Sequence, residues 1–191
     1  MKLETIRKRL ERHRPARVEH NGFTRAAVAM ILREQADDCE VLLIQRTERV
    51  HDPWSGHMAF PGGREDAADP ELDYTAARET HEEVGIDLGH AAHLIGGLDD
   101  IQAIARDRPM SMVIRPYVYA LHQEVTTRPD GREVQETVWL PMSFLTHPDA
   151  KGVYRRELNG EMQDFPAFVY RGYTVWGLTY RMLTTFLDLV R

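Results

Sequence analysis

Apolar residues along this chain gather in short runs whose spacing predicts a helix or a strand. Residues 3–12 place apolar side chains three to four positions apart among charged ones, which predicts a short amphipathic helix. Two nearly continuous apolar runs follow, at 24–33 and 41–44, and a polar turn at 34–38 separates them. Runs of this length and composition are typical of buried strands.

The rest of the chain continues with strands and ends on a helix. We predict strands at 58–60, 93–98, 112–121 and 134–140, a loop at 99–110, a short helix starting at Pro141, a hairpin pairing 153–158 with 165–170 across Asn159-Gly160, and a closing helix at 174–190. This order indicates an α/β or α+β domain with a mixed sheet between helices.

Composition adds limits to this picture. The 191 residues suit a single domain, 1–191, in which residues 1–20 form an N-terminal helical extension. A net charge of −6 argues against a protein that binds the nucleic-acid backbone. No apolar run approaches the roughly 20 residues of a membrane span, and no signal-peptide core is present, so a cytoplasmic protein without membrane contact is expected.

An acidic segment carries the chemistry. If residues 73–84 are helical, successive side chains turn by about 100°, and Glu79, Glu82 and Glu83 share one stripe away from the apolar side. Like charges at this spacing repel by roughly 0.2–0.5 kcal/mol per pair, which favours a bound cation. Oxygen ligands suit Mg²⁺ or Mn²⁺ better than zinc. The alternative interpretation is a solvated surface.

The surroundings of the stripe decide between these two interpretations. Residues 62–86 combine a glycine pair, an acidic loop and the sequence Arg-Glu-x-x-Glu-Glu-x-Gly-Ile. This arrangement resembles the Nudix box, the loop–helix–loop motif of enzymes that hydrolyse a nucleoside diphosphate linked to another group. The resemblance implies an α/β/α sandwich with a central mixed sheet and a pyrophosphohydrolase that depends on Mg²⁺ or Mn²⁺. Asp69 stands where the motif has a glutamate, and the interval to Arg78 is one residue longer than in the commonest form.

The same resemblance gives roles to single residues. It implies that Glu79, Glu82 and Glu83 bind metal, with Glu82 and Glu83 also taking part in catalysis. The Gly63 carbonyl matches a position that often adds an oxygen ligand. Arg78 is a candidate cofactor-binding residue, although a structural role that holds the loop to the helix is favoured; Asp69 is expected to orient Arg78 or to add charge.

Two interpretations of the general base stay open. Some Nudix enzymes use a glutamate of the box, and others use a glutamate on a later loop. Glu133 precedes a strand that closes at Pro141, as in the coenzyme A pyrophosphatase branch of the family, and is the candidate on such a loop. Glu136 is a weaker candidate.

The substrate prediction rests on the same branch. Leu42-Leu43-Ile44-Gln45-Arg46-Thr47 and the segment 56–63 keep the ends of its upstream pattern, so Arg46 is a candidate substrate-binding residue. His51 stands where the pattern has an internal arginine, which is at best displaced to Arg49, and Trp54 could stack on a base. Coenzyme A or its thioesters are therefore the expected substrates of a monomer or homodimer. The alternatives are nucleotide sugars, ADP-ribose or nucleoside triphosphates, and a non-catalytic nucleotide sensor.

Overall fold

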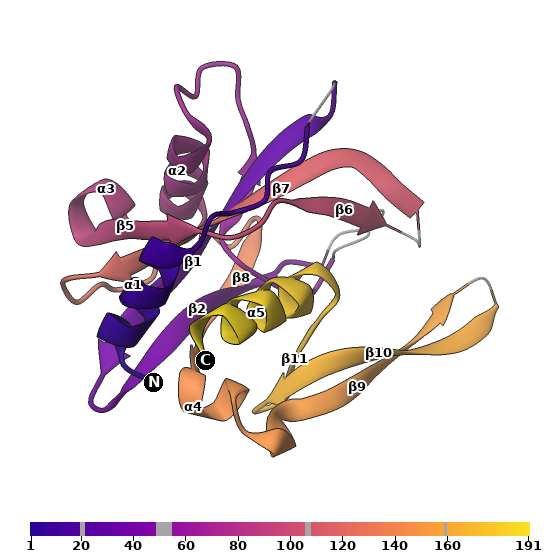
Figure 1. Cartoon of the computed structure of the whole chain (residues 1–191). Helices are drawn as coiled ribbons and strands as arrows, with labels where there is room; N and C mark the ends of the chain where they lie inside the picture. Colours follow the sequence, from indigo (N-terminus) through magenta and orange to yellow (C-terminus); the bar gives the residue numbers. More distant parts are fainter. Residues whose placement is uncertain (20–21, 49–54, 106–107, 159) are drawn as a thin grey trace.

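The computed structural model describes residues 1–19, 22–48, 55–105, 108–158 and 160–191 of the chain. Its helices are α1 (Leu3–Arg12), α2 (Leu72–Val84), α3 (Leu88–Ala91), α4 (Met142–Leu145) and α5 (Gly177–Val190), with a 3₁₀ turn η1 at Pro148–Ala150. Its strands are β1 (Thr24–Gln35), β2 (Asp38–Arg46), β3 (Met58–Ala59), β4 (Gly62–Arg64), β5 (Ala92–Gly97), β6 (Ile101–Ala105), β7 (Arg108–Leu121), β8 (Val134–Pro141), β9 (Lys151–Leu158), β10 (Glu161–Tyr170) and β11 (Tyr173–Trp176). Within this part of the chain the strands form two sheets, of eight and three strands (Figure 1).

The larger sheet is mixed. β1 pairs in parallel with β7, from Thr24↔Met112 to Leu32↔Ala120, whereas it pairs antiparallel with β2 and β4. The pairs β2–β3, β2–β8, β5–β7 and β6–β7 are also antiparallel. A parallel pair requires a long crossover connection, and α2 lies within the connection between β1 and β7. The mixed sheet with helices on both sides confirms the fold class expected from the order of elements.

Side chains of β1 alternate between two buried cores. Ala29 and Ile31 pack with residues of α2 in one core, whereas Met30 and Leu32 pack with residues of α1 and α5 in the other. Successive strand side chains point to opposite faces, so a strand covered on both faces needs apolar residues at every position. This is the reason for the continuous apolar run in the sequence.

The helices cover the sheet on opposite faces. Figure 1 shows α2 and α3 on one side and α1 and α5 on the other. α1 buries Leu3, Ile6 and Leu10, which confirms the predicted amphipathic helix at the N-terminus. Among the described residues, no helix has both the length and the apolar character needed to cross a bilayer.

The smaller sheet lies beside α5 and consists of β9, β10 and β11 (Figure 1). β9 and β10 form the predicted hairpin, with Leu158 opposite Glu161, and both strands extend beyond the predicted bounds. Asn159, in the predicted turn, lies outside the described residues. Thr179 of α5 donates a hydrogen bond of 2.9 Å to the Met58 carbonyl, which ties this helix to β3.

Two predicted segments differ from the structure. The loop expected at 99–110 contains β6, which pairs with β7 at Ile101↔Ile114 and Gln102↔Val113. The closing helix begins at Gly177 rather than at residue 174, because residues 173–176 extend the small sheet as β11. Both strands pair with a neighbour across a short connection, β6 with β7 and β11 with β10, but they have only 5 and 4 residues, too few for local periodicity to reveal them. The short helix near Pro141 is confirmed, with Pro141 as its N-cap.

Candidate active site

Two glycines allow the loop before α2 to approach both β1 and the helix. Gly62 has φ +148°, and a Cβ there would lie 2.3 Å from the Ala27 carbonyl oxygen. A Cβ on Gly63 would lie 2.4 Å from the carboxyl carbon of Glu79. The glycine pair therefore lets β4 pack against β1 and leaves the space that the Glu79 carboxylate occupies.

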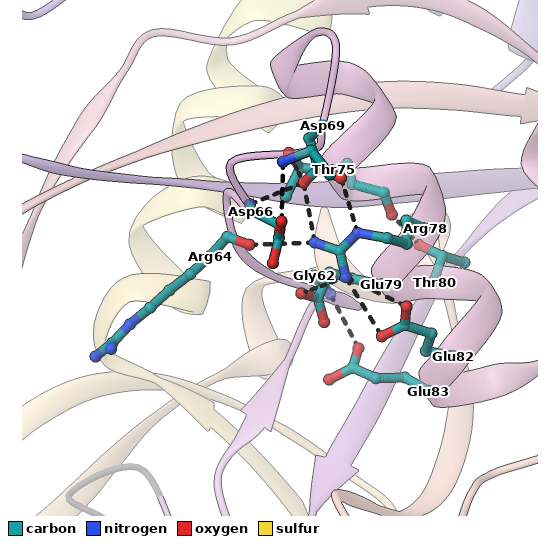
Figure 2. Close-up of polar contacts among 12 residues, drawn as sticks. Gly62, Arg64, Asp66, Asp69, Thr75, Arg78, Glu79, Thr80, Glu82 and Glu83 are labelled. Atoms are coloured by element: carbon teal, nitrogen blue, oxygen red, sulfur yellow. Dashed lines mark hydrogen bonds and ion pairs between the residues drawn. The ribbon is translucent and has the colours of Figure 1, made fainter.

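Arg78 lies at the centre of this motif (Figure 2). Its Nε and Nη2 atoms donate hydrogen bonds of 2.9 and 3.0 Å to the two oxygens of Asp69. Its Nη1 atom donates to Glu79 at 3.0 Å and to Glu82 at 3.3 Å, and Nη2 also reaches the Arg64 carbonyl at 3.3 Å. The hydrogen bonds from Arg78 hold the pKa of Asp69 well below its usual range.

These contacts confirm that Asp69 orients Arg78. They also fit the structural role for Arg78, because a planar guanidinium that binds a carboxylate with two parallel hydrogen bonds fixes the loop against the helix. Binding of a cofactor or substrate by Arg78 stays a prediction.

Glu83 is the most buried glutamate of the motif, with 3% of its surface exposed. Its Oε2 atom accepts a hydrogen bond of 2.9 Å from the Gly62 amide (Figure 2). Burial raises the pKa of Glu83 to about 8, and the charges of Glu79 and Glu133 add to this rise, while the Gly62 amide and the charge of Arg46 oppose it. Burial also raises the pKa of Glu79, partly countered by Arg78.

The expectation of a stripe facing away from the core is therefore wrong for Glu83. The side chain of Glu82 is 57% exposed and that of Glu79 19%, while Glu83 shares the buried side of α2 with Thr80 and Val84. The reason is that β4 packs along the flank of α2 and covers it, which a helical wheel does not include. α2 ends as expected, with Gly85 in the left-handed conformation at φ +71°.

Glu133 approaches the same carboxylates from a turn before β8. Asp130 Oδ1 accepts hydrogen bonds from the backbone amides of residues 132, 133 and 134, at 2.9–3.0 Å, and so fixes the turn. The Glu133 carbonyl accepts a hydrogen bond of 2.9 Å from the Thr47 amide at the end of β2. Glu133 and Glu79 line the same cavity, and the charge of Glu133 adds to the rise in the pKa of Glu79 and of Glu83.

Glu136 makes its contact with the smaller sheet rather than with the box carboxylates. Its carboxylate accepts a hydrogen bond of 3.0 Å from the hydroxyl of Tyr173, which belongs to the smaller sheet. This contact is consistent with its ranking below Glu133.

A cavity of about 870 Å³ opens between the motif, α5 and the smaller sheet. The predicted site residues Arg46, Gly63, Glu79 and Glu133 all line this cavity; Glu82 and Glu83 do not. His57 also lines it. His51, Arg49 and Trp54 lie outside the described residues.

Sequence reasoning missed several residues of the cavity wall. Polar and aromatic members of the wall that were not predicted include Arg64, Arg156, Phe165, Trp176 and Arg181. All but Arg64 are far from the motif in sequence. The signal available was the pair of alternating strands at 153–158 and 165–170, but that pattern does not tell which face meets a cavity.

The donor set fits a hard divalent cation in its chemistry. The possible ligands are the carboxylate oxygens of Glu79, Glu82, Glu83 and Glu133. A bound cation would offset both the repulsion between these carboxylates and the cost of burying their charge. In the described arrangement Nη1 of Arg78 bridges Glu79 and Glu82, and no three acidic, histidine or cysteine side chains of the described residues are grouped to hold a metal ion. Metal binding by Glu79, Glu82 and Glu83 stays a prediction.

Curated relatives include an uncharacterized protein of Schizosaccharomyces pombe, 40% identical over 114 residues that make up 58% of this chain and 34% of that protein. A mitochondrial coenzyme A diphosphatase of Homo sapiens is 29% identical over 73% of this chain and 58% of its own. A peroxisomal coenzyme A diphosphatase of Mus musculus is 24% identical over 87% of this chain and 70% of its own. The chain thus spans about a third and somewhat over half of the first two relatives.

Solved structures show the same fold. A MutT/nudix family protein from Enterococcus faecalis superposes with a TM-score of 0.56 at 17% identity, covering 100% of this chain and 70% of that one. An Ap4A hydrolase of C. elegans superposes with a TM-score of 0.52 at 23% identity, covering 63% and 81%. The NUDIX domain model matches residues 23–158, and the chain therefore belongs to the Nudix hydrolase family.

Proposed function

We propose that this protein is a Mg²⁺- or Mn²⁺-dependent pyrophosphohydrolase that cleaves the diphosphate of coenzyme A or of its thioesters. Support for the substrate comes from coenzyme A diphosphatases among its relatives. It also comes from the segment 56–63 with the longer spacing to Arg78, which resembles the same branch.

The observation that carries the hydrolase proposal is the group of carboxylates at the cavity. Glu79 and Glu133 line the cavity, and Glu83 lies buried behind them with its pKa raised to about 8. A buried cluster of like charges costs stability unless a cation neutralises it. The Gly62 amide donates a hydrogen bond to Glu83, and Arg78 donates one to Glu79. These contacts hold the carboxylates in place, as a site for a charged substrate requires.

A divalent cation held by Glu79, Glu82 and Glu83 would neutralise charge on the diphosphate oxygens and lower the pKa of the attacking water. Glu133, on its fixed turn, accepts the proton of that water. Arg46 and Arg64, which line the cavity, bind the phosphate oxygens.

The products follow from the bond that breaks. Water attacks one phosphorus of the diphosphate and the bridging P–O bond breaks, so coenzyme A gives 3′-phosphoadenosine 5′-phosphate and 4′-phosphopantetheine. The thiol takes no part, and thioesters are expected to react in the same way.

A panel of substrates tests the proposal. Coenzyme A, acetyl-coenzyme A, ADP-ribose, a nucleotide sugar and a nucleoside triphosphate are incubated with Mg²⁺ or Mn²⁺, and the products are identified by mass spectrometry. Cleavage of coenzyme A at the diphosphate supports the proposal. Cleavage of ADP-ribose or a nucleotide sugar alone overturns the substrate, and nucleotide binding without cleavage of any compound supports the sensor alternative.

Other expectations remain predictions. Binding of a small nucleotide rather than of nucleic acid agrees with the net charge of −6. We keep the predictions of one domain, a cytoplasmic location and a monomer or homodimer. Fluorescence microscopy of a tagged chain and light scattering test the last two.

A further inference from the structure

The wall of the cavity opposite the box motif contains a cluster of aromatic rings. Trp176, at the end of β11, lies 4.7 Å from the His57 ring and 5.4 Å from the Phe165 ring, measured between centroids. Tyr154 stacks on Trp176 with centroids 4.3 Å apart and does not line the cavity, so it supports the Trp176 ring from behind. These contacts hold a flat aromatic surface at the cavity.

Cationic side chains accompany this surface. The guanidinium carbon of Arg156 lies 5.6 Å from the centroid of the Trp176 ring, and Arg181 lines the same cavity from α5. Neither Arg156 nor Arg181 forms an ion pair with an acidic side chain among the described residues. By contrast, the neighbouring Arg155 faces away from the cavity and pairs with Asp164 at 2.7 Å.

The contrast matters because the ion pair with Asp164 occupies the donors of Arg155, whereas Arg156 and Arg181 have donors available for a ligand in the cavity. Guanidinium groups bind phosphate through two parallel hydrogen bonds, and aromatic faces stack on nucleobases. Trp176 and Arg181 lie on β11 and at the start of α5, away from the box motif on α2, so they are placed to recognise a substrate rather than to act on the reacting bond.

We propose that Trp176, Arg156 and Arg181 form a subsite for a nucleobase whose ribose carries a phosphate in addition to the diphosphate. This inference rests on the proposed function: in coenzyme A, the adenosine 3′-phosphate half would occupy the subsite, with the base against Trp176 and the 3′-phosphate on the two arginines. The three side chains determine specificity and touch no reacting atom.

Binding of non-reacting nucleotides tests the subsite without turnover. Calorimetry compares adenosine 3′,5′-bisphosphate with adenosine 5′-monophosphate on the wild type, Arg156→Gln, Arg156→Lys and Arg181→Gln. Loss of one charge-assisted contact should weaken binding of the bisphosphate about tenfold to a hundredfold and leave the monophosphate nearly unchanged. Arg156→Lys should recover part of the loss, and Trp176→Leu should weaken both nucleotides by roughly tenfold.

Arg155→Gln is the matched control, since it changes the adjacent residue on the other face of β9 and should change neither affinity. Melting temperatures confirm that each variant is folded. In turnover, Arg156→Gln should reduce the ratio of kcat/KM for coenzyme A over 3′-dephospho-coenzyme A by a similar factor.

The results separate this proposal from the function on which it rests. If the wild type binds both nucleotides equally, or if Arg156→Gln and Arg181→Gln keep the preference for the bisphosphate, the subsite assignment is wrong even when coenzyme A is hydrolysed. If coenzyme A is not hydrolysed but the preference exists and disappears in both arginine variants, the proposed function fails and the subsite stands.

Discussion

Glu83 is joined to Gly62 by a hydrogen bond of 2.9 Å from the Gly62 amide to Oε2, across 21 positions of sequence. This contact ties the last glutamate of the motif to its first glycine. It also explains why a glutamate is tolerated on the buried side of α2, because one of its side-chain oxygens satisfies a backbone donor.

Glu83→Gln tests the role of this carboxylate. The amide oxygen can still accept from Gly62, so folding should persist, whereas kcat should fall by about two to three orders of magnitude, as for other losses of electrostatic stabilisation. Steady-state kinetics with saturating metal measures the change. Glu65→Gln, outside the cavity and paired with Arg25, is the control; near-full activity of Glu83→Gln would contradict the assignment.

Gly63→Ala should disturb Glu79 directly. The added methyl group would lie 2.4 Å from the Glu79 carboxyl carbon, so the side chain must move and both stability and activity should fall. In a Glu79→Ala background the loss of stability should largely disappear, because the clashing group is gone. Urea unfolding of the two single variants and the double variant measures this coupling. Equal losses in both backgrounds would place the strain elsewhere.

Metal binding should stabilise the folded chain. A ligand present at 100 times its Kd and bound only by the native state adds about 2.7 kcal/mol to the free energy of unfolding. Titration calorimetry and melting temperatures with millimolar Mg²⁺ or Mn²⁺, with and without nucleotide, measure the effect. A variant with glutamine at 79, 82 and 83 should show no shift. Absence of binding in the wild type would refute the metal site.

Glu133→Gln should lower kcat by about 10²–10⁴-fold if this residue is the general base. Metal affinity should change little, because Glu133 is not one of the three expected metal ligands. Glu136→Gln, whose carboxylate contacts Tyr173, should retain most of the parent rate. If Glu133→Gln also does, a glutamate of the box is the base.

Asp100 links the N-terminal segment to the sheet through ion pairs and hydrogen bonds. Because these contacts need the ionised carboxylate, we expect the protein to lose stability in acid. Its fully buried carboxylate accepts hydrogen bonds from Arg115 at 2.8 Å, Arg17 at 2.9 Å and the Val18 amide at 3.2 Å. Burial raises its pKa, but the hydrogen bonds from Arg115 and Val18 and the nearby arginine charges outweigh this and lower the pKa below its usual value.

Because the folded pKa is lowered, the contribution of Asp100 to stability is present above the pKa of the unfolded chain and disappears as pH falls through the folded pKa. Asp100→Asn should therefore cost on the order of 3 kcal/mol at pH 7 and progressively less in acid. Denaturant unfolding between pH 3 and 7 measures the difference. Asp164→Asn, which breaks an exposed pair, should change little; a constant loss at all pH values would rule out the ion pair as its cause.

The sequence alone determined the elements whose signal is local. The apolar run of β1, the amphipathic α1 and the hairpin of β9 and β10 follow from periodicity and turn chemistry, since each pattern is complete within a dozen residues. The spacing of Glu79, Glu82 and Glu83 after the glycine pair was likewise enough to indicate the family and its chemistry.

The tertiary structure decided what depends on distant partners. It buried Glu83 beneath β4 and joined Asp69 to Arg78. It also placed Glu133, which lies far from the box in sequence, beside the same cavity as Glu79. It also placed Trp176 on the cavity wall. The burial of a side chain, its pKa and its place in a cavity wall depend on which surfaces pack together. The sequence pattern shows which residues share a face of a helix or strand, but it does not show which other element covers that face.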